Sequence, residues 1–253
     1  MLVGLSAKFA KLSRDETSDE LQAACLVTQT LDASVDLDAL GQQMRRLAAG
    51  CDAGIDPWNY LRQVGFRGNA DHYGALDNSR IDLVLQNRRG IPITLGVVLI
   101  HVGRELGHRT QGVNFPGNFL VRVDDALIDP FHMTQTSEEE CLRDYAHATA
   151  DAFVAAPPRA IAMRMLNNLK FNFAAVGSWD RALDILDYQL AMEPGSPGLL
   201  IERGDFWSRL GAIDMARQAY ESAVARTAAA DLATRSLVAR RLAMLPDRKD
   251  PLH

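Results

Sequence analysis

The feature that most constrains this chain is the apolar stretch at residues 93–106, where polar side chains are rare. The exceptions are Thr94, His101, Arg104 and Glu105. A helix that is apolar around most of its circumference belongs inside a domain and not on its surface. Pro92 suits the first position of a helix, and Gly107 suits the left-handed residue that commonly ends one. The sequence therefore predicts one buried helix around which the domain is organised.

Short β segments follow this helix. Residues 110–115 are predicted as a strand, and residues 119–123 and 126–129 as a hairpin that turns at Asp124 and Asp125. A two-residue turn gives a register that places Asn118 and Asp129 on one face of the sheet, roughly 7 Å apart. The expected fold class is α+β, with the N-terminus of the buried helix directed toward a small antiparallel sheet.

A helix start followed by two strands is the layout of a cysteine-protease-like catalytic triad. The first position needs a helix N-terminus, because the helix dipole stabilises a thiolate. The second position needs a base, and the third needs an acceptor that orients this base. The candidates for the three positions are Thr94, Asn118 and Asp129.

Three motifs carry a family resemblance, namely RRGIPITL, GVNFPGNFLVRV and LIDPF. They resemble the core of a bacterial family of regulators of SirC expression, in which a transglutaminase-like domain precedes C-terminal tetratricopeptide repeats. The resemblance extends from Leu61 to about Met244. It implies a transglutaminase-like (papain-like) core with the Cys, His and Asp of active enzymes at Thr94, Asn118 and Asp129. Only the acid is kept.

These replacements weigh against catalysis. A threonine hydroxyl needs an adjacent general base, and the amide of Asn118 has no usable titration at neutral pH. The strand register places His132 on the opposite face from Asn118. His101 lies about 10 Å along the helix axis from Thr94. We therefore expect a pseudoenzyme in which Thr94 caps its helix and Asn118 bonds Asp129 or a loop backbone. The alternative is residual acyl transfer by Thr94 with one of the two histidines.

Composition excludes several classes of partner. The net charge of the 253 residues is −5 and the isoelectric point is about 5.7. Both values argue against a nucleic-acid surface and against an anionic membrane as partner. The three cysteines lack metal-ligand spacing and suit a reducing compartment. Because the N-terminus is also a poor signal peptide, we expect a cytoplasmic protein without a metal or cofactor.

Two arginines, Arg88 and Arg89, precede the central helix. They could bind a carboxylate or phosphate, because guanidinium groups match the geometry of these anions. Alternatively, they could form structural ion pairs with Glu105, Asp82 or Asp124. Both interpretations stay open from the sequence.

In the rest of the chain, residues that favour helix starts, helix ends or turns mark the boundaries of the predicted elements. Further helices are predicted within residues 17–31, 36–49, 57–64 and 79–87, and an irregular loop over 66–78. Residues 1–16 are predicted to be frayed. Residues 155–158, Ala-Ala-Pro-Pro, are predicted as a linker because paired prolines stop both helix and sheet. The expected domains are 1–156, the N-terminal helices with the transglutaminase-like domain, and 157–253, an all-α segment.

An internal repeat occupies this second part. Gly177 and Asp180 recur 34 residues later as Gly211 and Asp214. A period of this length is the tetratricopeptide pattern. We predict two repeats over 163–196 and 197–230, followed by a capping helix.

The first helices of tetratricopeptide repeats line a peptide groove in longer members of that class. The matching binding candidates here are Arg164, Asn167 and Arg209. We therefore predict a non-catalytic adaptor or regulator that binds an unidentified protein or peptide, with the oligomeric state left open. The alternatives are a residual acyl-transfer enzyme and a sensor of an anionic small molecule that uses Arg88 and Arg89.

Overall fold

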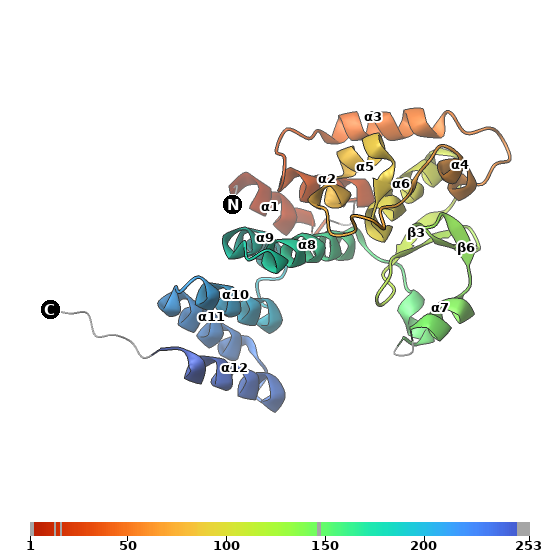
Figure 1. Ribbon diagram of the computed structural model, residues 1–253. Helices are drawn as coiled ribbons and strands as arrows, with labels where there is room; N and C mark the ends of the chain where they lie inside the picture. The colour runs from red at the N-terminus through yellow and green to blue at the C-terminus, as the bar shows by residue number, and fades with distance from the viewer. Residues whose placement is uncertain (1–2, 13, 16, 146–147, 247–253) are drawn as a thin grey trace. The chain divides into compact units, whose positions relative to one another are not determined.

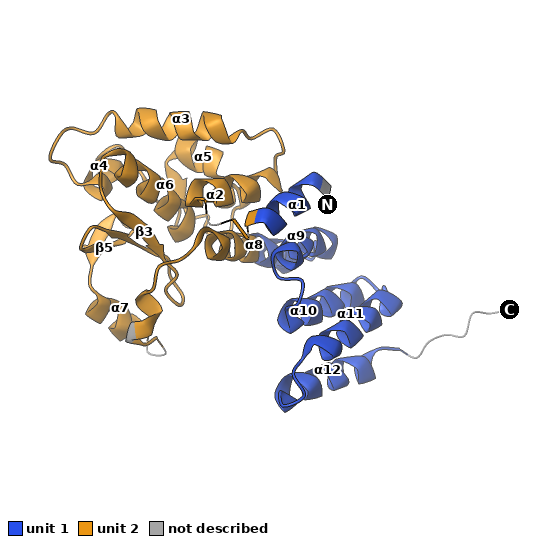
Figure 2. Ribbon diagram, turned by 180° about the vertical axis from the view of Figure 1, so that it is seen from behind, with its two compact units in different colours: residues 1–11, 169–253 blue, residues 12–168 orange. Residues whose placement is uncertain are grey.

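The computed structural model describes residues 3–12, 14–15, 17–145 and 148–246 (Figure 1). The chain divides into two compact units (Figure 2). The first, Leu12–Asn168, we call the core unit; the second, Met1–Lys11 with Leu169–His253, we call the C-terminal unit. The sequence predicts a boundary after residue 156, whereas this division falls further along, inside a helix.

Residues 155–158 are not a free linker. The backbone N–H of Ala156 donates to the carbonyl of Gly112 at 2.7 Å, and Ala155 forms an antiparallel bridge with Val113. Pro158 then begins helix α8 (Pro158–Ala175), at a position where the missing N–H of proline costs nothing. The linker prediction was wrong because the prolines separate a strand-like segment from a helix within one unit.

The first residues form a helix, α1 (Val3–Leu12), where a frayed end was predicted. Leu5 and Phe9 are buried, and the ring of Phe9 packs against Tyr188 with centroids 5.1 Å apart. An apolar stripe this short is not visible as a period in the sequence, so burial against a distant residue determines the helix.

The central helix of the core unit is α6 (Pro92–Glu105), as predicted. The helices that precede it in this unit are α2 (Glu20–Gln29), α3 (Leu37–Ala48), α4 (Pro57–Gln63) and α5 (Ile81–Asn87). All four contact α6, and so do two strands of the sheet (Figure 1). The apolar circumference of α6 is thus buried by neighbours on several sides.

Local hydrogen bonds fix the starts of two of these helices. Asp19 accepts from the backbone N–H of Gln22 at 2.8 Å, and the Gln22 side chain accepts from the backbone N–H of Asp19 at 3.2 Å. This capping box begins α2. Asp36 begins α3 by accepting from the N–H of Ala39 at 2.8 Å.

The antiparallel sheet has the order β3 (Thr110–Val113), β4 (Leu120–Val123), β5 (Ala126–Asp129), β6 (Thr134–Thr136). Val123 pairs with Ala126, which confirms the predicted hairpin register. Strand β6 was not predicted, because its polar Thr-Gln-Thr sequence has no apolar alternation. Helix α7 (Glu138–Asp144) follows the sheet, and a 3₁₀ turn, η2 (Ala150–Phe153), precedes α8.

The two faces of this sheet have different neighbours. Leu127 belongs to an apolar cluster with Cys141 of α7. Val121 faces α6 instead, because a Cβ atom on Gly96 would lie 3.2 Å from its Cγ2. Side chains alternate between faces along a strand. The register position of Asp129 therefore belongs to the face of Leu127, away from α6.

A short parallel pair lies beside the start of α6. Strands β1 (Arg67–Gly68) and β2 (Arg89–Gly90) pair Arg67 with Arg89 and Gly68 with Gly90. The first strand falls inside the predicted loop, which also contains the start of a 3₁₀ turn, η1 (Leu76–Ser79).

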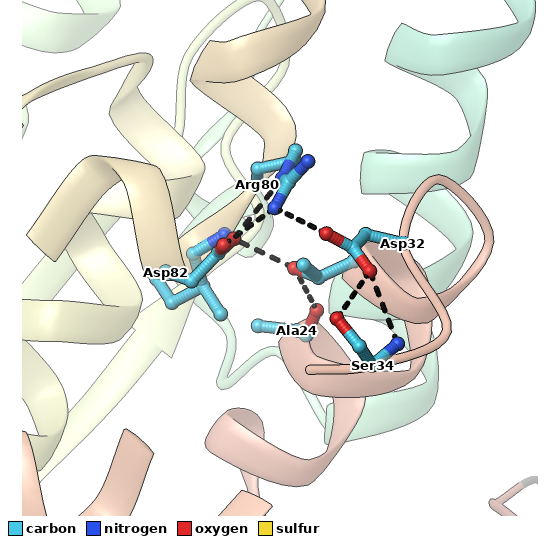
Figure 3. A network of polar contacts seen from close by, with 7 residues as sticks. Ala24, Asp32, Ser34, Arg80 and Asp82 are labelled. Atoms are coloured by element: carbon cyan, nitrogen blue, oxygen red, sulfur yellow. Dashed lines mark hydrogen bonds and ion pairs between the residues drawn. The ribbon is translucent and has the colours of Figure 1, made fainter. Parts of the chain in front are cut away.

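A polar network joins the segment after α2 to the start of α5 (Figure 3). Arg80 donates to Asp32 at 2.9 Å and to Asp82 at 2.7 Å. The hydroxyl of Ser34 donates to Asp32 at 2.6 Å, and this bond is the main cause that lowers the pKa of Asp32. The network fixes the segment that leads into α5.

After α8, the C-terminal unit continues with α9 (Trp179–Met192), α10 (Pro197–Arg209), α11 (Ile213–Arg226) and α12 (Leu232–Met244). Each of the helices from α9 to α12 contacts the next one along the chain.

The turns before α9 and α11 repeat each other. Gly177 and Gly211 both have left-handed backbones, with φ of 74° and 75°. The N–H groups of Ser178 and Ala212 each donate to the carbonyl five residues earlier, at 2.9 and 3.0 Å. Because both pairs of residues are 34 positions apart, the period of the sequence is also a period of the backbone.

Among the described residues, no helix combines the length and apolarity that a bilayer span requires. The cytoplasmic location stays a prediction.

Candidate functional site

Thr94, the candidate nucleophile position, lies in the first turn of α6 and is fully buried. Its hydroxyl donates to the carbonyl of Asn78 at 2.8 Å and accepts from the backbone N–H of Ile91 at 3.2 Å. A Cβ atom on Gly90 would lie 2.8 Å from the same oxygen. The hydroxyl is thus enclosed and its hydrogen bonds go to the backbone.

Asn78, which sequence reasoning missed, extends this contact into the loop 66–78. Its Nδ2 donates to the carbonyls of His72 and Tyr73 at 2.7 and 2.9 Å. Its Oδ1 accepts from Asn69 Nδ2 at 2.9 Å. Thr94 therefore anchors, through Asn78, the loop that lies before α5.

Asn118, at the position of the base, turns to its own backbone. Its Oδ1 accepts from the N–H of Phe119 at 2.8 Å, which agrees with the expected loop contact. This interaction uses the amide as a neutral acceptor and transfers no proton.

Asp129, at the position of the acid, has two partners just after β5. Oδ1 accepts from the N–H of Phe131 at 2.8 Å, and Oδ2 lies 2.7 Å from His132 Nδ1. The sequence predicts His132 on the opposite face from Asn118 only if the strand alternation continues past Asp129. The strand ends at Asp129, however, and the chain turns, so the imidazole folds back onto this carboxylate. The His132 side chain is 67% exposed.

His101 lies on α6 and interacts with Glu105 on the next turn, with Nε2 and Oε1 3.6 Å apart. Burial lowers the pKa of His101, and Glu105 opposes this effect. Its Nε2 is buried without a hydrogen bond. Neither His101 nor His132 bonds the hydroxyl of Thr94, because every hydrogen-bond partner of that hydroxyl within the described ranges is a backbone group.

Arg88 and Arg89 have different environments. Arg88 has a left-handed backbone, with φ of 56°, and its Nη1 donates to the carbonyl of Val64 at the end of α4. Arg89 instead pairs in register with Arg67, which sequence reasoning did not select. Arg67 and Arg89 are far apart in the sequence, and the pairing of β1 with β2 brings them together.

The acids suggested as partners of the two arginines bind other groups. Glu105 interacts with His101, Asp82 with Arg80, and Asp124 with His108 and Arg109. The suggested ion pairs of Arg88 and Arg89 were therefore wrong.

The predicted groove residues fall into different units. Arg164 and Asn167 belong to the core unit, and Arg209 belongs to the C-terminal unit. Arg164 donates to Asn114 Oδ1 at 2.6 Å and to the carbonyl of Phe115 at 3.0 Å. Arg209 lies over the ring of Trp179, 4.5 Å from its centroid. Asn167 is exposed.

No group of three His, Cys, Asp or Glu side chains in the described part of the chain is placed to hold a metal ion.

Comparison with known proteins identifies the family of the domain that contains Thr94, Asn118 and Asp129. The family model of the transglutaminase-like superfamily matches residues 34–167. A UPF0162 protein of Xylella fastidiosa strain Temecula1 is 38% identical over 166 residues, which are 60% of this chain and 59% of that protein. The F-box only protein 21 of Mus musculus is 32% identical over 179 residues, which are 62% of this chain and 28% of that protein.

These matches leave part of each relative uncovered. The chain spans 59% of the length of the Xylella relatives. No solved structure matches the chain significantly.

Proposed function

Because the chain belongs to the transglutaminase-like superfamily, we propose that it is a non-catalytic member whose domain binds a protein or peptide. The hydroxyl at the nucleophile position carries this proposal. Thr94 is fully buried and donates to the carbonyl of Asn78. A nucleophile must instead be accessible to substrate and adjacent to a base. The amide of Asn118 at the base position supports the same conclusion, since it cannot shuttle a proton.

The C-terminal unit supports the adaptor part of the proposal. We propose that residues 163–196 and 197–230 are two tetratricopeptide repeats, on the basis of the repeated turns at Gly177 and Gly211. The matching region forms only 28% of the F-box only protein 21 of mouse. That relative carries the domain as one part of a larger protein, which is consistent with a modular binding role.

Turnover of ester and amide probes by the purified full chain tests this proposal. The matched variants are Thr94→Val, which removes the hydroxyl, and His132→Asn, which removes the imidazole bound to Asp129. We expect the three proteins to have the same rate, no higher than that of the buffer. A wild-type rate that falls in Thr94→Val would overturn the proposal.

Residual hydrolysis is the second candidate, and the pair Asp129–His132 is the observation that favours it. A carboxylate that binds Nδ1 leaves Nε2 available as a base, as in other acid–imidazole pairs. The pair His108–Asp124 at the turn of the hairpin has the same Nδ1–Oδ2 contact, at 2.8 Å, and serves as a control. Hydrolysis that is lost in His132→Asn but kept in His108→Asn would support this second candidate.

A further inference from the structure

Arg164 is a partly buried guanidinium whose hydrogen bonds all leave from Nη1. Across the described residues, no acceptor meets its Nε or Nη2. Neither atom is among the buried side-chain polar atoms that lack a partner in the described residues. A guanidinium binds an oxyanion through two such parallel N–H groups.

No carboxylate balances this charge within the described part of the core unit. The carbonyl of Phe115 accepts from Arg164 Nη1, and the ring of Phe115 contacts that of Tyr145, so these residues are neighbours. Burial lowers the pKa of the Arg164 guanidinium, and the phenols of Tyr73 and Tyr145 oppose this effect. Arg80 and Arg104, by contrast, each bind a carboxylate. Because a desolvated cation without a counter-charge is unfavourable, an anion at Arg164 would be stabilising.

The two tyrosines are held by aromatic neighbours. Tyr73 comes from the loop anchored by Asn78 and is 54% exposed; its ring centroid lies 5.9 Å from that of Phe131. Tyr145 follows α7 and meets Phe115 edge to face at 5.4 Å. In the described residues no acceptor binds either phenol hydroxyl, so both remain available as donors.

We propose that Arg164, Tyr73 and Tyr145 form a binding site for an oxyanion, with Nε and Nη2 of Arg164 holding two of its oxygens. The planar guanidinium fork suits a carboxylate or a phosphate. The phenol hydroxyls add neutral donors to the same group. This inference rests on the proposed binding function and deepens it by naming the chemistry recognised. In this proposal Arg164, at the start of the first proposed repeat, binds its ligand together with residues of the core unit.

Titration of the full chain by NMR at constant ionic strength tests the site. The probes are inorganic phosphate, acetate, and one acetylated dipeptide prepared both as the free acid and as the C-terminal amide. We expect the free acid, but not the amide, to shift the signals of Asn114 and Tyr73. The phosphate arm distinguishes a free anion from the carboxylate of a peptide.

Three variants test whether anion binding depends on these side chains. Arg164→Gln is expected to weaken binding about tenfold or more. The double variant Tyr73→Phe/Tyr145→Phe keeps both rings and is expected to weaken binding a few-fold. Arg46→Gln removes an exposed arginine of the core unit to which no binding role is assigned, and it should leave the affinity unchanged.

The proposal is overturned if no anion shifts these signals, if Arg164→Gln binds like the wild type, or if Arg46→Gln weakens binding equally. If Arg164→Gln fails to fold, the double tyrosine variant decides, and unchanged affinity overturns the proposal. Turnover at Thr94 is measured separately. Loss of the anion site therefore leaves the test of the proposed function intact.

Discussion

The ring of Tyr220 occupies the space that a side chain at Gly204 would need. A Cβ atom there would lie 2.3 Å from Tyr220 Cε1. At the positions 34 residues earlier, Lys170 replaces the glycine and Leu186 replaces the tyrosine. A larger residue on one helix thus accompanies a smaller one on the other.

Gly204→Ala is expected to destabilise the protein by about 1–3 kcal/mol, because the added methyl group overpacks the contact with Tyr220. Alanine otherwise favours a helix. The matched control is Gly198→Ala in the same helix, where the nearest atom to the added Cβ is Ser196 Oγ at 3.9 Å. Urea unfolding gives the free energies of unfolding. Equal effects of the two substitutions would contradict the packing argument.

Glu202→Gln is expected to cost more stability than Lys170→Met. Lys170 is buried, and its Nζ donates to Gln189 Oε1 at 2.8 Å and to Glu202 Oε2 at 2.5 Å. Removing the carboxylate leaves a buried ammonium without a counter-charge, for a loss of about 1–3 kcal/mol. Removing the lysine leaves Glu202, which is 39% exposed and can be solvated. Denaturant unfolding of both variants tests this order, and the reverse order would refute it.

His101 is expected to make the protein more stable as the pH rises through the range just below 6.5. Burial lowers its pKa from that ordinary value, against Glu105 and Asp19. The unfolded chain therefore binds the proton more tightly, so stability is full above this value and falls as the pH falls. Asp32 also has a lowered pKa, but its ordinary value is 3.8 and its effect lies at lower pH.

Unfolding free energies between about pH 5 and pH 7 measure this slope. His101→Gln should flatten it, whereas His72→Gln, a change at an exposed histidine, should not. An unchanged slope in His101→Gln would show that other groups cause it.

Thr94→Cys is expected to add a thiol that reagents cannot reach in the folded protein, because position 94 is fully buried. The native cysteines provide the reference, since Cys25 and Cys141 are buried and Cys51 is partly exposed. Counting reactive thiols before and after denaturation tests the prediction. The new thiol should appear only after denaturation, and rapid reaction in the native state would mean that the position is open.

The parts of the fold that could be predicted depend on local pattern. The apolar circumference of α6 and the turn at Asp124 and Asp125 determined the central helix and the hairpin register. Helix α1 and strand β6 escaped prediction because their stability comes from contacts with distant residues, such as that between Phe9 and Tyr188.

The candidate site shows the same limit. Sequence reasoning selected Thr94 and Asp129, yet their actual partners are Asn78 and His132. It selected Arg88 beside Arg89, whereas the register of β1 and β2 pairs Arg89 with Arg67. Adjacent residues in a sequence commonly diverge in space, so contacts between loops cannot be deduced from their spacing.

The hydrogen bond from Thr94 to the carbonyl of Asn78 has an evolutionary consequence. A thiol is a much weaker donor than a hydroxyl, so a cysteine at position 94 would loosen the loop before it could gain any reactivity. A cysteine at this position would therefore need a compensating change at Asn78 to keep the loop in place. The hydroxyl of Thr94 would thus be retained for the stability that it supplies, whatever chemistry the position could otherwise support.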